Sequence, residues 1–545
     1  MGTIFGAEAI VKCLDREGIE MVFGIPGHYN MPIFDALYNH PRIRTITVRH
    51  EQGAAFMADG YARATGMPAA IIPLPGPGLT NAMTGIGEAY YDSSPMLILV
   101  TQVDRRFIDQ DAGLLHEMTK QYEILEPLTK SGFRLREGAE ISPLFHQAMS
   151  ELRNGRPRPV QIEIPLDIQQ ESMTWTDEMG NLEPATANPA VPPADQIEEV
   201  VSALIKADRP LLYTGGGTIS SGASAELTRL AERLGAPVLM TGMGVGAVPG
   251  NHRLACGVAW APVADITPLV KACDLFLAVG TRFNEAMTHS WNLPLPEQTI
   301  RIDIDPLEIE RNLPMSQKVV GDAKAVLTAI HESLDSQGYG QKQEMHPDLS
   351  KAQKELLSAL ETRVGSTLPW MKTMRDTLPR NTILSCDMSL FWADMLGIFP
   401  IYEPRTMLFP WGFGTLGFAL PEAIGAKLAK PDSPVVAICG DGAFLFTGTE
   451  LATAIQYNLS LPIIIPNNNA YGMIKMQQRD RYDERFMSVD LINPDLIALA
   501  HAFGANGEKV TDPAGFSAAL KAALAAEKPT VIEIPWGWGW GQENQ

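Results

Sequence analysis

The chain has 545 residues, of which 45% are hydrophobic and 19% are charged, and its formal net charge is −20. A chain of this length is too long for one hydrophobic core, so we expect three domains. The acidic balance argues against a general nucleic-acid-binding surface, which needs a basic face. The five cysteines are scattered and form no Cys-x-x-Cys pair. No apolar run reaches transmembrane length, and the first residues do not show the basic and apolar regions of a signal peptide. We therefore expect a cytoplasmic protein that binds neither nucleic acid nor membranes.

The first unit, residues 1–175, alternates short apolar runs with segments whose apolar residues recur at helical spacing. Strands are expected at residues 21–25, 43–48, 69–74 and 96–101, with helices at 7–18, 53–64 and 81–91, and the unit ends near 160–165. Strands that alternate with helices are typical of a parallel α/β sheet, whose functional loops follow the carboxyl ends of its strands.

Two further units of the same kind are expected at residues 190–340 and 360–545. Stretches poor in apolar anchors at 183–193 and 336–350 are interpreted as linkers. The expected strands are 210–214, 275–280 and 299–304, then 382–386, 435–439, 463–465 and 530–534. The fold class is therefore α/β, with three Rossmann-like, doubly wound parallel-sheet domains. The alternating Trp and Gly at 536–541 either pack one or two rings on the surface or close over an active site.

One stretch of the third unit joins two buried strands to polar residues that suit an anion and a cation. The Gly-Asp-Gly turn around Asp441 follows one apolar run, and Asn468 follows the next. Both should lie at the carboxyl ends of neighbouring parallel strands, beside a helix amino terminus, where anions bind. Thr447 and Glu450 have the spacing of a capping box, which marks the start of a helix. A carboxylate, an amide oxygen and a main-chain carbonyl are hard ligands that, with two phosphates, complete an octahedron around Mg²⁺.

This stretch resembles the thiamine diphosphate signature, in which a Gly-Asp-Gly turn is followed by paired asparagines at the separation of Asp441 from Asn468. Further likeness lies in four runs, at residues 49–55, 58–63, 76–81 and 413–421. They are similar to runs of the thiamine diphosphate-dependent enzymes of the acetolactate synthase, pyruvate decarboxylase and benzoylformate decarboxylase type. The resemblance implies that the three units are the pyrimidine-binding, central and diphosphate-binding domains, in this order.

The resemblance assigns cofactor activation to Glu51, which would hydrogen-bond the aminopyrimidine ring and favour the imino tautomer that removes the thiazolium C2 proton. In a dry pocket, desolvation should raise the pKa of this carboxyl group. Gly414 would accept a hydrogen bond from the 4′-amino group through its carbonyl, and Leu416 would bend the cofactor into a V. The implied Mg²⁺ ligands are Asp441, Asn468 and the carbonyl of Ala470. The other implied cofactor contacts are Pro26, Asn81, Gly442, Ala443, Tyr471, Gly472 and Met473.

Three histidines are acid–base candidates, because imidazole titrates near neutrality. His28 stands where acetolactate synthases have a second glycine and pyruvate decarboxylases an acid; capping of the following helix is its alternative role. His116 lies where acetolactate synthases carry Phe-Gln-Glu and pyruvate decarboxylases a His pair; a surface position is the alternative. His50 neighbours Glu51 and would reach the substrate. The expected substrate pocket consists of His28, Leu115, His116, Trp411 and Gln477, with core packing as the alternative for Trp411.

Two departures argue against a strict acetohydroxyacid synthase. Where the biosynthetic enzymes have Gln-Trp-Gln, this chain has Met-Gln-Gln ending at Gln478, and where they have Pro-Lys-Asp, it has Pro-Leu-Asp ending at Asp167. In the central unit, the runs 215–217 and 280–283 resemble the flavin-binding version of the domain. The run 255–260 between them does not match that version well, so the resemblance leans against FAD.

We therefore predict a thiamine diphosphate- and Mg²⁺-dependent 2-oxo acid decarboxylase or carboligase that resembles acetolactate synthase and acts on a small 2-oxo acid or aldehyde. The alternatives are an aryl 2-oxo acid decarboxylase, a 2-hydroxy ketone lyase or carboligase, and an inactive paralogue that binds the cofactor for regulation. In this family the residues matching Glu51 and Asp441 come from different subunits. The resemblance thus implies a homodimeric active site and, often, a homotetramer.

Overall fold

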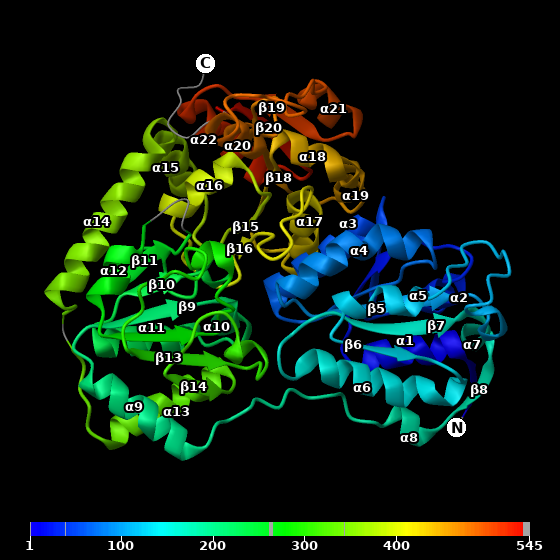
Figure 1. The fold of residues 1–545 in the computed structure, drawn as a ribbon. Coiled ribbons are helices and arrows are strands. Elements are labelled where there is room, and N and C mark those ends of the chain that lie inside the picture. The colour runs from blue at the N-terminus through cyan, green and yellow to red at the C-terminus, as the bar shows by residue number, and fades with distance from the viewer. Residues whose placement is uncertain (1, 39, 261–264, 343, 538–545) are drawn as a thin grey trace.

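The computed structural model of the chain describes residues 2–38, 40–260, 265–342 and 344–537. It contains three six-stranded parallel sheets, one after another along the chain and each flanked by helices (Figure 1). These sheets confirm the prediction of three doubly wound α/β units. A separate antiparallel ribbon pairs β1 (Gly2–Phe5) with β8 (Ser172–Trp175) and joins the two ends of the first unit. No helix among the described residues is long and apolar enough to cross a membrane.

The first sheet has the strand order β3-β2-β4-β5-β7-β6, with every pair parallel. Its strands are β2 (Met21–Gly24), β3 (Arg44–Thr47), β4 (Ala69–Ile71), β5 (Met96–Gln102), β6 (Ser131–Arg134) and β7 (Val160–Pro165). Every residue of β5 and β7 is buried, because helices cover both faces of the sheet. The helices α1 (Gly6–Arg16) and α6 (Ile141–Arg153) share one core with it, and α3 (Glu51–Thr65) and α4 (Pro77–Tyr91) share the other.

The central sheet has the order β11-β10-β9-β12-β13-β14. Its strands are β9 (Pro210–Thr214), β10 (Val238–Met240), β11 (Ala255–Val258), β12 (Leu275–Val279), β13 (Gln298–Asp303) and β14 (Gln317–Val320). Helices α9 (Ala194–Lys206), α11 (Ser224–Leu234) and α13 (Ala323–Ser336) pack against it in one core. Counted from β9, this is the 3-2-1-4-5-6 order of dinucleotide-binding folds, whose ligands bind where the order reverses, here between β9 and β12.

The third sheet has the order β16-β15-β17-β18-β20-β19. Its strands are β15 (Ile383–Cys386), β16 (Met407–Leu408), β17 (Val435–Ile438), β18 (Pro462–Asn467), β19 (Asn506–Lys509) and β20 (Thr530–Pro535). Helices α15 (Leu368–Thr377), α16 (Leu390–Ile398) and α22 (Pro513–Ala525) line one of its faces, and α17 (Ala419–Ala429) lies on the other.

The two predicted linkers have different outcomes. Residues 181–193 contain no helix or strand. The prediction for 336–350 is wrong at its far end, because α14 (Pro347–Val364) begins inside it. His346 caps this helix by accepting a hydrogen bond from the Asp348 N–H at 3.2 Å. The exact domain boundaries stay predictions.

Helices α3 and α17 join the first domain to the third (Figure 1). A Cβ placed on Gly60 of α3 would lie 2.1 Å from the Glu422 carbonyl, and one on Gly425 of α17 would lie 2.0 Å from the Met57 carbonyl. The two helix backbones thus touch where each has a glycine. The core of α3, α4 and α17 is continuous, so the first and third domains share one hydrophobic core within the chain.

Candidate active site

The carboxyl ends of β17 and β18 lie next to each other, because these strands are paired neighbours. β17 ends at Ile438, and helix α18 (Asp441–Thr447) begins at Asp441, which is only 3% exposed. β18 ends at Asn467, directly before Asn468. Asp441 and Asn468 therefore occupy adjacent strand ends beside a helix amino terminus.

The predicted capping box is correct in position but wrong in its side-chain bonds. Thr447 ends α18 and is also the N-cap of the 3-10 turn Gly448–Glu450, which leads into α19 (Leu451–Gln456), but its side chain makes no capping hydrogen bond. The Thr447 hydroxyl donates a hydrogen bond to the Gly417 carbonyl at 2.7 Å. This bond ties α18 to the loop that precedes α17.

Glu450 has a different role from the predicted one. Its buried carboxyl group accepts hydrogen bonds from the backbone N–H groups of Arg49 and His50, both at 3.0 Å, and from the Thr453 hydroxyl at 2.6 Å. Burial raises the pKa of this group, and the donors oppose the rise. Glu450 thus connects the third domain to the two residues that precede Glu51.

Asn493, which the sequence analysis missed, adds a polar side chain next to Asp441. Its Nδ2 donates to Asp441 Oδ2 at 2.7 Å and to Asn469 Oδ1 at 3.2 Å. Asn468 Oδ1 accepts a hydrogen bond from the Ala470 N–H at 3.1 Å. Burial raises the pKa of Asp441, while Asn493 opposes the rise. A carboxylate, amide oxygens and a nearby carbonyl form a donor set that suits Mg²⁺.

The other residues predicted to contact the diphosphate end of the cofactor follow the same two strands, β17 and β18. Gly442 and Ala443 lie in the first turn of α18, where backbone N–H groups are free of helical partners. Tyr471 is the N-cap of α20 (Gly472–Arg481), which also carries Met473 and the exposed Gln477.

The chain end passes beside this site. Trp536 N donates to the Asn467 carbonyl at 3.0 Å, and Asn468 Nδ2 donates to the Gly537 carbonyl at 3.4 Å. The Trp536 ring is 7% exposed and packs 4.6 Å from Phe391, centroid to centroid. The rest of the Trp-Gly run, residues 538–541, lies outside the described residues, as does any lid that it forms.

Glu51 is the first residue of α3 and is 9% exposed. Its Oε2 accepts a hydrogen bond from Asn81 Nδ2 on α4 at 3.0 Å. His50 is exposed and caps α3, with its Nδ1 accepting from the Gln52 N–H at 3.2 Å. Pro26 is exposed in the turn that follows β2.

Two of the candidate histidines meet around a tyrosine. The Tyr29 ring lies 4.8 Å from His28 and 6.2 Å from His116, centroid to centroid. His28 does not cap the next helix, α2 (Met31–Leu37), because Asn30 is its N-cap. His116 is half-buried with φ 63°, and its buried Nδ1 has no hydrogen-bond partner among the described residues. Leu115 beside it is 67% exposed.

Trp411 packs among aromatic side chains. Its ring lies 4.9 Å from Phe409, 5.1 Å from Trp392 and 6.2 Å from Trp260. It is half-buried against the core shared by the central and third domains. Gly414 and Leu416, further along the same loop, are also half-buried. A substrate contact for Trp411 stays a prediction.

Within the described chain, no hydrogen bond or ion pair joins Glu51 to Asp441. The two groups lie on different domains, and Glu450 is the residue of the third domain that reaches the start of α3.

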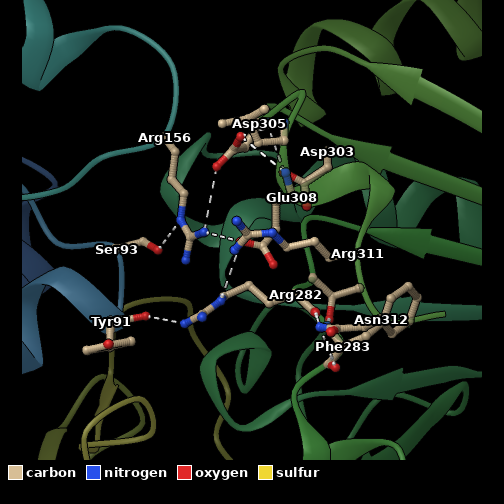
Figure 2. A network of polar contacts seen from close by, with 12 residues as sticks. Tyr91, Ser93, Arg156, Arg282, Phe283, Asp303, Asp305, Glu308, Arg311 and Asn312 are labelled. Carbon is tan, nitrogen blue, oxygen red and sulfur yellow. Dashed lines mark hydrogen bonds and ion pairs between the residues drawn. The ribbon is translucent and has the colours of Figure 1, made fainter. Parts of the chain in front are cut away.

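A separate cavity of about 880 Å³ lies among the three domains. Gly216 and Gly217, Gly280 and Asp303 line it at the carboxyl ends of the central strands. Its wall toward the first domain is a polar network (Figure 2) in which Arg156 Nη1 meets Glu308 at 2.7 Å and Arg282 Nη1 donates to the Tyr91 carbonyl at 2.7 Å. The glycine runs that resemble the flavin-binding version of the domain therefore lie beside the same cavity.

Comparison with known proteins gives three family matches. Residues 4–124 match the thiamine pyrophosphate enzyme N-terminal TPP binding domain, residues 197–330 the central domain, and residues 388–534 the C-terminal TPP binding domain; thiamine pyrophosphate is thiamine diphosphate.

Curated relatives cover nearly the whole chain. The probable acetolactate synthase large subunit of Methanocaldococcus jannaschii is 35% identical over 97% of this chain and 91% of its own. The acetolactate synthase large subunits of Parasynechococcus marenigrum and Haemophilus influenzae are 36% and 33% identical, each over 98% of this chain and over 87% and 94% of their own. The chain therefore belongs to the thiamine diphosphate-dependent enzymes, and it is an enzyme of the acetolactate synthase type that forms or cleaves carbon–carbon bonds.

Proposed function

We propose that the protein is a Mg²⁺-dependent 2-oxo acid decarboxylase and carboligase. The observation that carries this proposal is the buried Glu51 carboxyl group, held by Asn81 at the start of α3. A buried carboxyl group at that position is suited to share a proton with the aminopyrimidine ring. When bound, thiamine diphosphate supplies the nucleophilic carbon and the electron sink.

The chain's own residues would then act at two ends of the cofactor. Asp441, Asn468 and the Ala470 carbonyl would hold Mg²⁺ against the diphosphate, and the first turn of α18 would donate N–H groups to it. Gly414 would accept from the 4′-amino group, and Leu416 would support the bend of the cofactor. His28 and His116 would exchange protons with the substrate or orient a second carbonyl compound.

The site is proposed to form between two copies of the chain. This proposal rests on the family resemblance, in which the residues matching Glu51 and Asp441 come from different subunits. A homodimer is the smallest assembly that completes both sites, and a homotetramer would contain two such dimers.

Product analysis tests the proposed function. The purified protein would be incubated with pyruvate, longer aliphatic 2-oxo acids and aromatic 2-oxo acids, with and without thiamine diphosphate and Mg²⁺. We expect CO₂ release that requires both additions, with a ligated hydroxy ketone or hydroxy acid as product. Aldehyde as the sole product would favour a simple decarboxylase. Absence of CO₂ release from the whole panel would overturn the proposal.

Replacing His28 by alanine is expected to change the ratio of aldehyde to ligated product about tenfold, because general acid–base groups contribute about 10²–10⁴-fold to the step that they serve. The ratio would be measured by chromatography at equal substrate consumption. His501→Ala, an exposed histidine on α21 (Leu496–Ala502), is the matched control. An unchanged ratio and rate in His28→Ala would leave His28 without a part in the reaction.

The cavity among the three domains is proposed to bind a nucleotide-type ligand. Its position at the strand-order reversal of the central sheet and its glycine lining support this assignment. Acid release from the purified protein, followed by absorbance and chromatography, is expected to yield a compound that absorbs near 260 nm. Additional absorbance near 450 nm would identify FAD. The poor match of residues 255–260 to the flavin-binding version of the domain leads us to expect no such absorbance. Absence of any released nucleotide, and of binding by added adenine nucleotides or FAD, would contradict this proposal.

A further inference from the structure

The loop that carries Gly414 is fastened to α4 by two buried carboxyl groups. Glu88 Oε1 accepts from the Phe413 N–H at 3.3 Å, and Glu88 Oε2 accepts from the Thr415 N–H at 3.2 Å and its hydroxyl at 2.9 Å. One helical turn further on, Asp92 Oδ2 accepts from the Trp411 N–H at 2.9 Å. The N–H groups of alternate loop residues, 411, 413 and 415, are thus all bound by Glu88 of α4 or by Asp92, the C-cap of α4.

Gly414 lies in the middle of this fastened segment and keeps its own polar groups free. It has φ 71°, a left-handed conformation that favours glycine. In the described part of the chain, neither its N–H nor its carbonyl has a hydrogen-bond partner. The residues on both sides are fixed, so the direction of the Gly414 carbonyl follows from the bonds that Glu88 makes.

We propose that Glu88 is a positioning residue for cofactor activation, which holds Phe413 and Thr415 so that the Gly414 carbonyl faces the aminopyrimidine ring. This inference rests on the proposed function, in which Gly414 and Glu51 bind that ring. Glu88 acts through the loop backbone and does not itself touch the cofactor. The same helix also holds Glu51 through Asn81, seven residues earlier, so α4 positions both ring contacts of the chain.

The surroundings of Glu88 make a neutral substitution tolerable. Three buried acids, Asp59, Asp92 and Glu422, form ion pairs with the guanidinium of Arg63. Glu88, also buried, lies beside two of them and interacts with the charges of Asp92 and Glu422. Burial raises the pKa of Asp92 and of Glu422, and the neighbouring carboxylates raise both further. Removing one negative charge from this group therefore lowers the repulsion, and Glu88→Gln is expected to fold.

The test is exchange of the cofactor's C2 proton for deuterium, followed by NMR in the absence of substrate. Glutamine at position 88 keeps one accepting oxygen and loses the other, so one backbone bond of the loop is broken. We expect exchange to slow about 10- to 100-fold, the scale of a lost hydrogen bond to a charged group. The affinity for thiamine diphosphate with Mg²⁺ is expected to change less than about threefold, because a single hydrogen bond far from the diphosphate contributes little to it.

Two further variants keep the test decisive. Thr415→Val removes the hydroxyl bond alone and is expected to slow exchange about three- to tenfold; it also tests the idea if Glu88→Gln does not fold. Glu17→Gln changes another buried glutamate, which accepts from Arg153 at 3.1 Å and from the Ala185 N–H at 3.0 Å, and should leave exchange unchanged.

A wild-type exchange rate in both Glu88→Gln and Thr415→Val would overturn the inference. Slow exchange only in variants whose melting temperature has also fallen would overturn it too, because destabilisation would then explain the result. Glu51→Gln, measured in the same assay, separates this failure from that of the proposed function. Fast exchange in Glu51→Gln would contradict the proposed function, whereas slow exchange in Glu51→Gln with normal exchange in Glu88→Gln would contradict the role of Glu88 alone.

Discussion

Replacing Glu51 by glutamine is expected to slow exchange of the C2 proton of bound thiamine diphosphate by about 10²–10⁴-fold, the usual contribution of a positioned acid–base group. Glutamine has the size of glutamate and can still be contacted by Asn81 Nδ2, which donates to Glu51 Oε2 at 3.0 Å. It cannot share a proton with the ring. The affinity for the cofactor should therefore remain within about tenfold, because the proposed Mg²⁺ and diphosphate ligands lie on another domain.

Two further variants serve as a control and as an intermediate case for the Glu51→Gln exchange rate. Gln52→Ala alters the next side chain of α3, which accepts and donates no hydrogen bond in the described chain, and should exchange at the wild-type rate. Asn81→Ala removes the donor that orients Glu51 and should give an intermediate rate, about tenfold slower. Rapid exchange in Glu51→Gln would show that another group removes the proton.

Replacing Asp441 by asparagine is expected to weaken binding of Mg²⁺ and thiamine diphosphate about 100-fold or more, on the scale of losing one partner of a buried charge pair. Asparagine keeps the shape of the side chain and an oxygen ligand but lacks the negative charge that attracts the cation. The affinity would be measured by isothermal titration with the metal and cofactor together. Binding of wild-type strength would contradict the assignment of Asp441 as a metal ligand.

In the cofactor-free protein, the same Asp441→Asn substitution is expected to raise the melting temperature or leave it unchanged. Burial raises the folded-state pKa of Asp441 above its unfolded value, so its ionisation costs stability. The protonated Asp441 therefore contributes to the free energy of unfolding at every pH below the unfolded-state pKa. This contribution is lost as the pH rises through the folded-state pKa. Asp441→Asn without cofactor should therefore melt at or above the wild-type temperature at neutral pH, and the difference should vanish in acid. Mg²⁺ should reverse this order by stabilising the wild type alone.

Mixing the two variants tests the dimeric site. If Glu51 of one subunit works with Asp441 of its partner, a heterodimer of Glu51→Gln and Asp441→Asn has one wild-type site and one doubly altered site. Refolding or co-expression should then restore activity to a quarter of the wild-type value, because half of the dimers are mixed and each has one working site. No restoration in verified heterodimers would place both residues of each site on one chain.

The residues that follow the strands could be predicted from the sequence, because this part of the fold depends on local chemistry. Apolar runs of strand length, the turn glycines and the separation of Asp441 from Asn468 indicated both the sheets and the cofactor class. Local patterns failed where a side chain had a stronger distant partner. The Thr447 hydroxyl bonds the Gly417 carbonyl and not the helix that follows it, and the Glu450 carboxyl group bonds the backbone of Arg49 and His50.

Tertiary structure alone decided which buried polar groups meet. Glu450 accepts hydrogen bonds from the backbone of Arg49 and His50, which precede it by 401 and 400 positions in the sequence. Glu88 accepts from the backbone of Phe413 and Thr415, which follow it by 325 and 327 positions. No period or spacing in a sequence encodes such pairs, because each arises only when α3, α4 and α17 pack into one core. A buried carboxyl group must find donors wherever packing places it, since leaving it unpaired costs several kcal/mol. The class of reaction is therefore a property of local motifs, whereas the orientation proposed for Glu51 and Gly414 toward the cofactor is a property of the packed helices.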